Sequence, residues 1–144
     1  MERIGPDGYV VSDDIERIDR TYVAEWLANQ SYWAIGRPRE VQDRAIDGSL
    51  NIGLYVPDGT MAGFCRFVTD RDTFAWLCDV FVDESHRGRG LGAFMVRSAV
   101  EHPDVVDVRR QVLISTTAQP LYARVGYTPL GDQAPVWMAR TRPS

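Results

Sequence analysis

The chain has 144 residues, 44% hydrophobic and 25% charged, which predicts a single globular domain spanning residues 1–144. Its net charge of −4 argues against a nucleic-acid partner, because such a partner favours a basic surface. No stretch approaches the roughly 18 apolar residues of a membrane span, and the N-terminal residues lack the apolar core of a secretory signal. We therefore expect a cytoplasmic protein with no membrane partner.

The first elements predicted along the chain are a short strand and a helix. Residues 8–11 form a strand candidate. Asp13, with Glu16 three residues later, is typical of the capping box that begins a helix. Apolar residues then recur at helical spacing from Ile15 to Leu27, which predicts a helix of about four turns.

A polar loop and a second helix should follow. The loop covers residues 29–36 and carries two bulky aromatic side chains, Tyr32 and Trp33. Pro38 suits the first position of a shorter helix, since its missing N–H costs nothing there, and Gly48 is suited to end it.

Three runs rich in apolar and β-branched residues come next, at 51–56, 61–69 and 74–82. Short turns separate them, so they predict an antiparallel meander. The two cysteines, Cys65 and Cys78, lie in neighbouring runs, and a hairpin between those runs would place them opposite each other. They are too few for a disulfide scaffold, and we interpret them as buried thiols. No Cys/His cluster has metal-ligand spacing, so no metal is expected.

A glycine-rich segment, Arg-Gly-Arg-Gly-Leu-Gly at 87–92, joins the third run to a helical pattern that reaches His102. A strand, a glycine turn and a helix N-terminus together favour an anion, because the first N–H groups of the helix lack partners and the helix dipole is positive there. The absence of Cβ atoms lets a ligand approach the backbone closely. The sequence therefore predicts a phosphate or pyrophosphate site.

The last part of the chain predicts a strand from Arg109 to Ile114, a short helix that begins at Pro120, and strands at 127–130 and 136–139. The complete order is β-α-α-β-β-β-α-β-α-β-β. Such a mixture is neither all-parallel nor all-antiparallel, and it indicates an α+β fold.

Two segments carry a resemblance to a known family. The loop resembles the acyl-CoA pyrophosphate loop of the GCN5-related N-acetyltransferases (GNATs), Arg/Gln-x-x-Gly-x-Gly/Ala, with Arg87, Gly90 and Gly92 at its fixed positions. The segment 120–127, Pro-Leu-Tyr-Ala-Arg-Val-Gly-Tyr, resembles the Leu-Tyr-x-x-x-Gly-Phe/Tyr segment of the same family. Both lie in the order and at the distance typical of that family, and the resemblance extends from the first helix to the end of the chain.

The resemblance implies a three-layer α-β-α fold with a central, mostly antiparallel sheet of about seven strands and about four helices. It also implies that the sheet splits between the run from Phe74 to Val82 and the run from Arg109 to Ile114. In the family, acyl-CoA lies in that V-shaped opening.

The loop also fits a dinucleotide-binding pattern, Gly88-x-Gly90-x-x-Ala93. A Rossmann unit, however, needs an acidic residue at the end of its second strand. The strand that follows here ends in Ser115-Thr116-Thr117, and too few residues remain for the rest of such a sheet. We therefore favour the acyl-CoA interpretation.

By this resemblance, acetyl-CoA is the expected cofactor, serving as acyl donor. The main chain from Val80 to Val82 should pair with the pantetheine arm, and Thr116 stands where the family often has an Asn-like contact to CoA. Arg87 and Arg89 add positive charge, and either guanidinium could pair with a phosphate oxygen. The alternative is that the loop is only a solvated basic turn before an ordinary helix. Phe81 belongs to the pantetheine-binding main chain. The backbone N–H groups expected around the pyrophosphate are those of Arg87, Gly88, Gly90, Leu91, Gly92 and Ala93.

Two residues are predicted to carry the chemistry. Tyr122 stands at the family position whose hydroxyl approaches the CoA sulfur, where a phenol can protonate the departing thiolate. Asp79 is the only charge in its apolar run and is the candidate base for the amine. The alternative for Asp79 is a structural pair with an arginine such as Arg66. His86, His102 and a water chain are the other candidate bases.

The acceptor site should lie near the loop between the first two helices. Tyr32, Trp33 and Trp76 could face an aromatic or cationic amine there, or could only fill the core or hold the loop. We expect transfer of an acetyl group to a primary amine of a small molecule by direct attack in a ternary complex. A protein α-amine or lysine acceptor, and a non-catalytic acyl-CoA-binding module, are the alternatives. A monomer or a homodimer is expected.

Overall fold

The computed structural model describes residues 1–131 and 136–143 and has one six-stranded sheet in the order β1-β2-β3-β4-β5-β6. Neighbouring strands are antiparallel except for β5 and β6, which are parallel. The mixed α+β fold expected from the sequence is confirmed. The strands are β1 (Glu2–Ile4), β2 (Val10–Ser12), β3 (Leu50–Tyr55), β4 (Met61–Thr69), β5 (Ala75–Val82) and β6 (Gln111–Val112).

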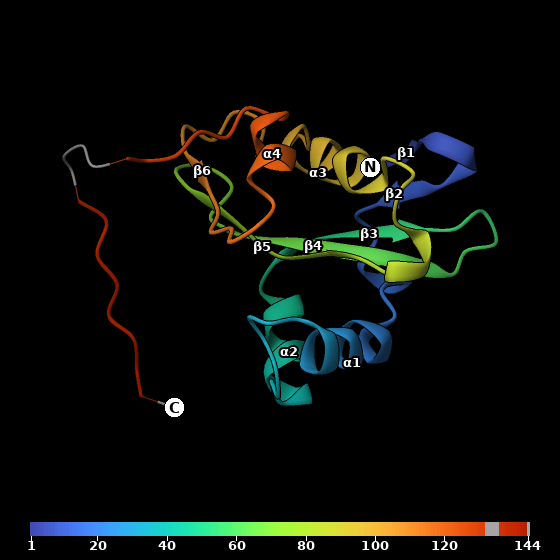
Figure 1. The fold of residues 1–144 in the computed structure, drawn as a ribbon, viewed down its shortest axis with the longest axis horizontal. Helices are drawn as coiled ribbons and strands as arrows, with labels where there is room; N and C mark the ends of the chain where they lie inside the picture. Colours follow the sequence, from blue (N-terminus) through green and yellow to red (C-terminus); the bar gives the residue numbers. More distant parts are fainter. Residues whose placement is uncertain (132–135, 144) are drawn as a thin grey trace.

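Helices cover both faces of this sheet, so the fold has three layers (Figure 1). One face carries α1 (Arg20–Gln30) and α2 (Arg39–Asp47), and the other carries α3 (Leu91–Val100) and α4 (Gln119–Ala123). Each interface has its own hydrophobic cluster, as expected when a sheet is buried on both sides. Short 3₁₀ turns occur at Pro6–Gly8, Ile15–Arg17 and Glu84–His86.

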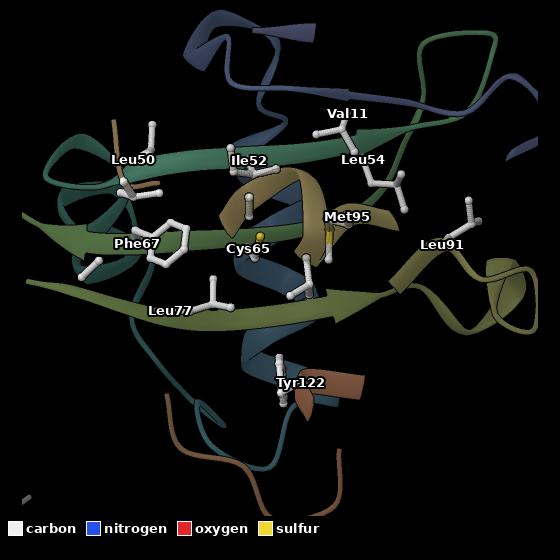
Figure 2. Packing of buried hydrophobic residues seen from close by; sticks show 14 of the residues in the cluster. Val11, Leu50, Ile52, Leu54, Cys65, Phe67, Leu77, Leu91, Met95 and Tyr122 are labelled. Carbon is white, nitrogen blue, oxygen red and sulfur yellow. The ribbon is translucent and has the colours of Figure 1, made fainter. Parts of the chain in front are cut away.

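The larger cluster joins the three central strands to α3. Buried side chains of β3, β4 and β5 belong to the same cluster as Leu91 and Met95 of α3, and these residues are at most 6% exposed (Figure 2). Tyr122 of α4 lies at the margin of this cluster, beyond β5 (Figure 2). The core therefore fixes α3, and with it the glycine loop, over the C-terminal end of β5.

The first helix begins later than the capping pattern predicts. A 3₁₀ turn occupies Ile15–Arg17, and α1 begins at Arg20 with Asp19 as its N-cap, accepting a hydrogen bond from the N–H of Tyr22. Asp13 caps neither element, because its carboxylate is hydrogen-bonded to His102 instead. The predicted capping box is therefore wrong, and a long-range contact is the reason.

The end of the chain also differs from expectation. Within the described part, neither 127–130 nor 136–139 is a strand, so the sheet has six strands rather than about seven. Residues 136–143 lead away from the domain as extended chain (Figure 1). Trp137 stacks on Phe74 with ring centroids 6.1 Å apart, an aromatic contact rather than a strand ladder. β-propensity without a paired neighbour does not make a strand.

A bulge in β5 reorients the strand at Asp79. Phe64 pairs with Phe81 and Arg66 pairs with Cys78, so Cys65 alone opposes the two residues Asp79 and Val80. Asp79 has a positive φ of 52°, which is unusual for a residue with a side chain. The two cysteines are thus offset by one position and do not face each other as a pair, contrary to the simple hairpin prediction.

Candidate functional site

The sheet opens between its last two strands, as the sequence resemblance implied. β6 pairs with β5 only at Ala75 and Trp76, although a longer strand from Arg109 to Ile114 was expected. Beyond that short ladder the segment 113–118 diverges from β5, and a cavity of about 770 Å³ lies between them. No described strand pairs with the outer edge of β5 from Leu77 to Val82. Its backbone groups are thus available to an extended ligand.

The glycine loop forms one end of the cavity. Gly88 and Gly90 have φ values of +84° and +74°, a conformation that side chains rarely adopt, and a Cβ at either would meet no atom within 4 Å. Gly90 is also the N-cap of α3, and no side chain caps it. The N–H groups of the first helical turn have no partners within the helix. Those at Leu91, Gly92 and Ala93 line the cavity, an arrangement that can bind an anion.

The two loop arginines are placed differently. Arg87 lines the cavity, and its Nε donates a hydrogen bond to the Val82 carbonyl at 3.1 Å, which ties the loop to the end of β5. Arg89 is exposed and is not among the residues that line the cavity. Arg87 is therefore the better placed of the two to face a phosphate.

Tyr122 lies on α4, on the wall opposite β5, and Thr116 lies on the same wall between β6 and α4. Burial raises the pKa of Tyr122 to about 12, and the neighbouring Cys65 and Tyr32 add to the effect. The phenol therefore keeps its proton at neutral pH, the state that a proton donor needs. Its ring packs edge-on against Tyr127, with centroids 6.0 Å apart.

Asp79 is buried, with its side chain 1% exposed, and both carboxylate oxygens have partners. Arg37 Nη1 and Arg66 Nε lie 2.7 and 2.8 Å from Oδ2, and the Trp33 indole N–H donates to Oδ1 at 3.0 Å. Burial acts to raise the pKa of Asp79, but the hydrogen bonds and charges of the two arginines outweigh it and lower the pKa. These contacts match the alternative in which Asp79 forms a structural ion pair with arginine, and the role of Asp79 as a base stays a prediction.

The three predicted acceptor-site aromatics all line the same cavity as the glycine loop. Tyr32 and Trp33 pack edge-on with centroids 5.0 Å apart. Tyr32, Trp33 and Trp76 are 62%, 40% and 42% exposed, so none of them is core. The bulge at Asp79 separates this aromatic end from Val80 to Val82, which lead to the loop.

The two histidines occupy different places. His86 lines the cavity at its loop end and is hydrogen-bonded through Nδ1 to the Tyr9 hydroxyl at 2.7 Å. His102 is 4% exposed and outside the cavity, with Nε2 2.7 Å from Asp13 and Nδ1 accepting from the Asp104 N–H. His102 therefore has a structural role at the end of α3.

Several cavity residues escaped the sequence-based prediction. Trp26 has an ordinary core position in the helical pattern, yet it stacks on Phe81 with centroids 4.0 Å apart and lines the cavity. Arg37 does not line the cavity itself but holds Asp79, and it gave no signal either, because nothing local links it to that residue, forty-two positions away. Gln30 also lines the cavity and is the last residue of α1, so a helical-wheel plot of that helix could have identified it beside the predicted loop. The remaining missed lining residues include Leu77, Cys78, Leu113 and Arg124.

Across residues 1–131 and 136–143, no group of three or more His, Cys, Asp or Glu could hold a metal ion. Over the same ranges, none of the helices combines the length and apolar character needed to traverse a bilayer.

Comparisons with known proteins agree with this geometry. The model of the acetyltransferase (GNAT) family matches residues 18–127. A candidate acetyltransferase of the GNAT family from Xanthomonas campestris pv. campestris is 38% identical, and its crystal structure superposes with a TM-score of 0.88 over 96% of each chain. A candidate acetyltransferase from Gibberella zeae is 25% identical over 127 residues, 76% of this chain and 72% of that one. A Clostridium acetobutylicum structure with acetyl-CoA shares the fold, with a TM-score of 0.65 at 12% identity over 98% of this chain and 96% of that one.

Proposed function

Because the chain belongs to the acetyltransferase (GNAT) family, we propose that it is an acetyl-CoA-dependent N-acetyltransferase acting on a primary amine of a small molecule. One observation carries this proposal. A single cavity joins the glycine loop, the free edge of β5, Tyr122 and an aromatic end at Tyr32. Donor and acceptor would therefore meet within one opening, next to a protonated phenol.

The residues of the cavity fit an acyl-CoA. The N–H groups of the first α3 turn and Arg87 would hold the pyrophosphate, where the open space beside Gly88 and Gly90 admits it. The free backbone of Val80 to Val82 would pair with the amides of the pantetheine arm, as an added strand does. The Phe81 side chain is buried against Trp26, so only its main chain is assigned to the cofactor.

Bound acetyl-CoA would supply an acetyl group activated as a thioester. The amine nitrogen forms the new bond to the acetyl carbon, the carbon–sulfur bond breaks, and sulfur leaves as a thiolate. Tyr122 is the proposed donor of the proton that this thiolate takes up, since the buried phenol is neutral. The reaction needs no covalent enzyme intermediate.

The amine must also lose a proton. Asp79 is a poor acceptor, because its carboxylate is already held by Arg37, Arg66 and Trp33. We propose that water in the open cavity carries the amine proton to solvent, and that Asp79 positions the residues around it.

Two alternatives remain part of the test. A protein α-amine or lysine would require the aromatic end to accept a peptide, and a non-catalytic module would bind acyl-CoA without using Tyr122. The experiment is release of free CoA thiol from acetyl-CoA against a panel of small amines, with CoA affinity measured in parallel by calorimetry. Amine-dependent thiol release supports the proposal. Tight CoA binding without release from any small amine contradicts it and favours the alternatives.

A further inference from the structure

Resting on the proposed function, we propose that the acceptor is a monoamine attached to an aromatic ring, recognised by Tyr32, Trp33 and Trp76. The inference concerns the end of the cavity remote from the glycine loop. It narrows the acceptor class from primary amines in general to those that present one ammonium and a flat apolar body.

Three large aromatic rings are exposed around one opening. Tyr32, Trp33 and Trp76 are 62%, 40% and 42% exposed, although such rings favour burial. All three line the cavity, and they come from two separate elements, the loop after α1 and the strand β5. A planar ligand between them would bury apolar surface that now contacts solvent.

The acceptor end of the cavity has no free carboxylate among its described residues. Among the lining residues in the described part of the chain, Asp79 is the only carboxylate, and its oxygens are taken by Arg37, Arg66 and Trp33. The carboxylate is therefore already neutralised by its own arginines and cannot pair with an ammonium of the ligand. A polyamine needs carboxylates for its second ammonium group, and this end offers none. One ammonium can instead be held over an aromatic face.

Hydrogen bonds within the loop after α1 order the aromatic wall before a ligand binds. The Ser31 hydroxyl donates to the Leu27 carbonyl at 2.7 Å and accepts from the Ala34 N–H at 2.9 Å, and the Gly36 N–H donates to the Ala28 carbonyl at 3.0 Å. These bonds fold the loop back on the end of α1. A wall ordered before binding loses little conformational entropy when a ligand arrives, which favours specific recognition.

Asp79 completes this wall as a positioning residue. Its Oδ1 accepts from the Trp33 indole, and its Oδ2 binds Arg37, so one carboxylate on β5 anchors both halves of the loop. The positive φ at Asp79 and the bulge it forms aim the carboxylate at the loop rather than along the sheet. Asp79 thus acts on the acceptor through Trp33, without touching the reacting atoms.

The test compares four amines of different chemistry as acceptors: 2-phenylethylamine, hexylamine, spermidine and glucosamine 6-phosphate. We expect kcat/KM for 2-phenylethylamine to exceed that for hexylamine about tenfold, the range expected when an aromatic contact replaces an aliphatic one. Tyr32→Ala and Trp76→Ala should each remove most of that ratio through KM, and CoA affinity should not change. Ile35→Ala is the matched control, because Ile35 lies in the same loop, is 72% exposed and does not line the cavity.

A binding measurement separates this inference from the proposed function. Calorimetry with CoA-saturated protein reports affinity for each amine whether or not the amine is acetylated. If 2-phenylethylamine binds preferentially but no amine is acetylated, the proposed function fails and the aromatic site stands. Equal or better binding of spermidine, hexylamine or the sugar phosphate overturns the inference, as does a ratio that survives loss of Tyr32 or Trp76.

Discussion

Replacing Gly92 with aspartate should abolish most of the affinity for CoA and leave the fold intact. Gly92 lies in the first turn of α3, where the proposed pyrophosphate contacts are made. A Cβ at this position would meet only Leu121 Cδ2 at 3.8 Å and Val82 Cγ2 at 4.0 Å, which are ordinary contacts. An acidic residue near a helix N-terminus is itself favourable by about 0.3–1 kcal/mol, so the free energy of unfolding should not fall.

The loss of affinity follows from charge. A carboxylate roughly 4 Å from a phosphate oxygen is repelled by about 4 kcal/mol at an effective dielectric constant of ~20, and by about 1 kcal/mol in bulk water. The first value corresponds to about a thousandfold in the dissociation constant and the second to about fivefold, and the open loop favours an intermediate value near thirtyfold. Added salt should reduce the loss, because the site is exposed enough for screening.

Calorimetry with CoA measures the effect, and Gly92→Ala is the matched control. Alanine adds the same Cβ without the charge, and in a helix it should stabilise the fold by about 0.5–1 kcal/mol relative to glycine. An aspartate variant that binds CoA as tightly as the parent would refute the proposed pyrophosphate contacts. Equal losses in both variants would show that Cβ bulk, and not charge, is excluded there.

Two further predictions concern the walls of the cavity, and a third concerns the contact between β4 and β5. Tyr122→Phe should lower kcat about a hundredfold, within the range of general acid catalysis, with CoA affinity unchanged; because burial raises the pKa of Tyr122 to about 12, kcat should show no alkaline loss below pH 10 from this group. Asp79→Asn should cost about 3–5 kcal/mol in the free energy of unfolding, since two arginines lose a buried partner. The pKa of Asp79 is lowered on folding, so its ionised carboxylate stabilises the folded state above the ordinary pKa near 4, and this stabilisation is lost as pH falls through the folded-state pKa. Denaturant unfolding should therefore show the free energies of unfolding of Asp79→Asn and the parent converging in acid. Gly63→Ala should lower the melting temperature, because its Cβ would lie 2.7 Å from the Phe81 carbonyl oxygen, and overpacking of this kind costs about 1–3 kcal/mol; an unchanged melting temperature would mean that β4 and β5 can separate freely.

The strand, glycine loop and helix around Gly90 were predictable because their signals are local. An apolar run, a pair of glycines and a helical repeat each report on a few neighbouring residues, and the structure places them as β5, a positive-φ turn and α3. The opening of the sheet came only from the family resemblance. Its physical cause is the two-residue ladder at Ala75 and Trp76, after which β6 ends.

The features that failed or escaped prediction depend on long-range contacts. Asp13 matches a capping box in sequence, yet His102, eighty-nine positions away, binds its carboxylate. Residues 127–130 have strand-like composition, but Tyr127 donates its hydroxyl to Gln111 and packs against the α3 cluster instead of pairing. Pattern reasoning has no access to partners at such separations.

The bulge at Asp79 shows how one such contact can change the interpretation of a residue. By pattern alone, a lone carboxylate in an apolar strand is equally suited to a base or to a buried ion pair. In a regular strand Leu77 and Val80 would face opposite sides, yet both pack on the α3 cluster, so one residue has been inserted between them. That insertion directs the Asp79 carboxylate toward Arg37 and Trp33, and its bonds to them hold the loop after α1 in place. The residue that looked like a base on its own strand is thereby tied to the acceptor wall, and its loss should change which amine is accepted before it changes how the proton leaves.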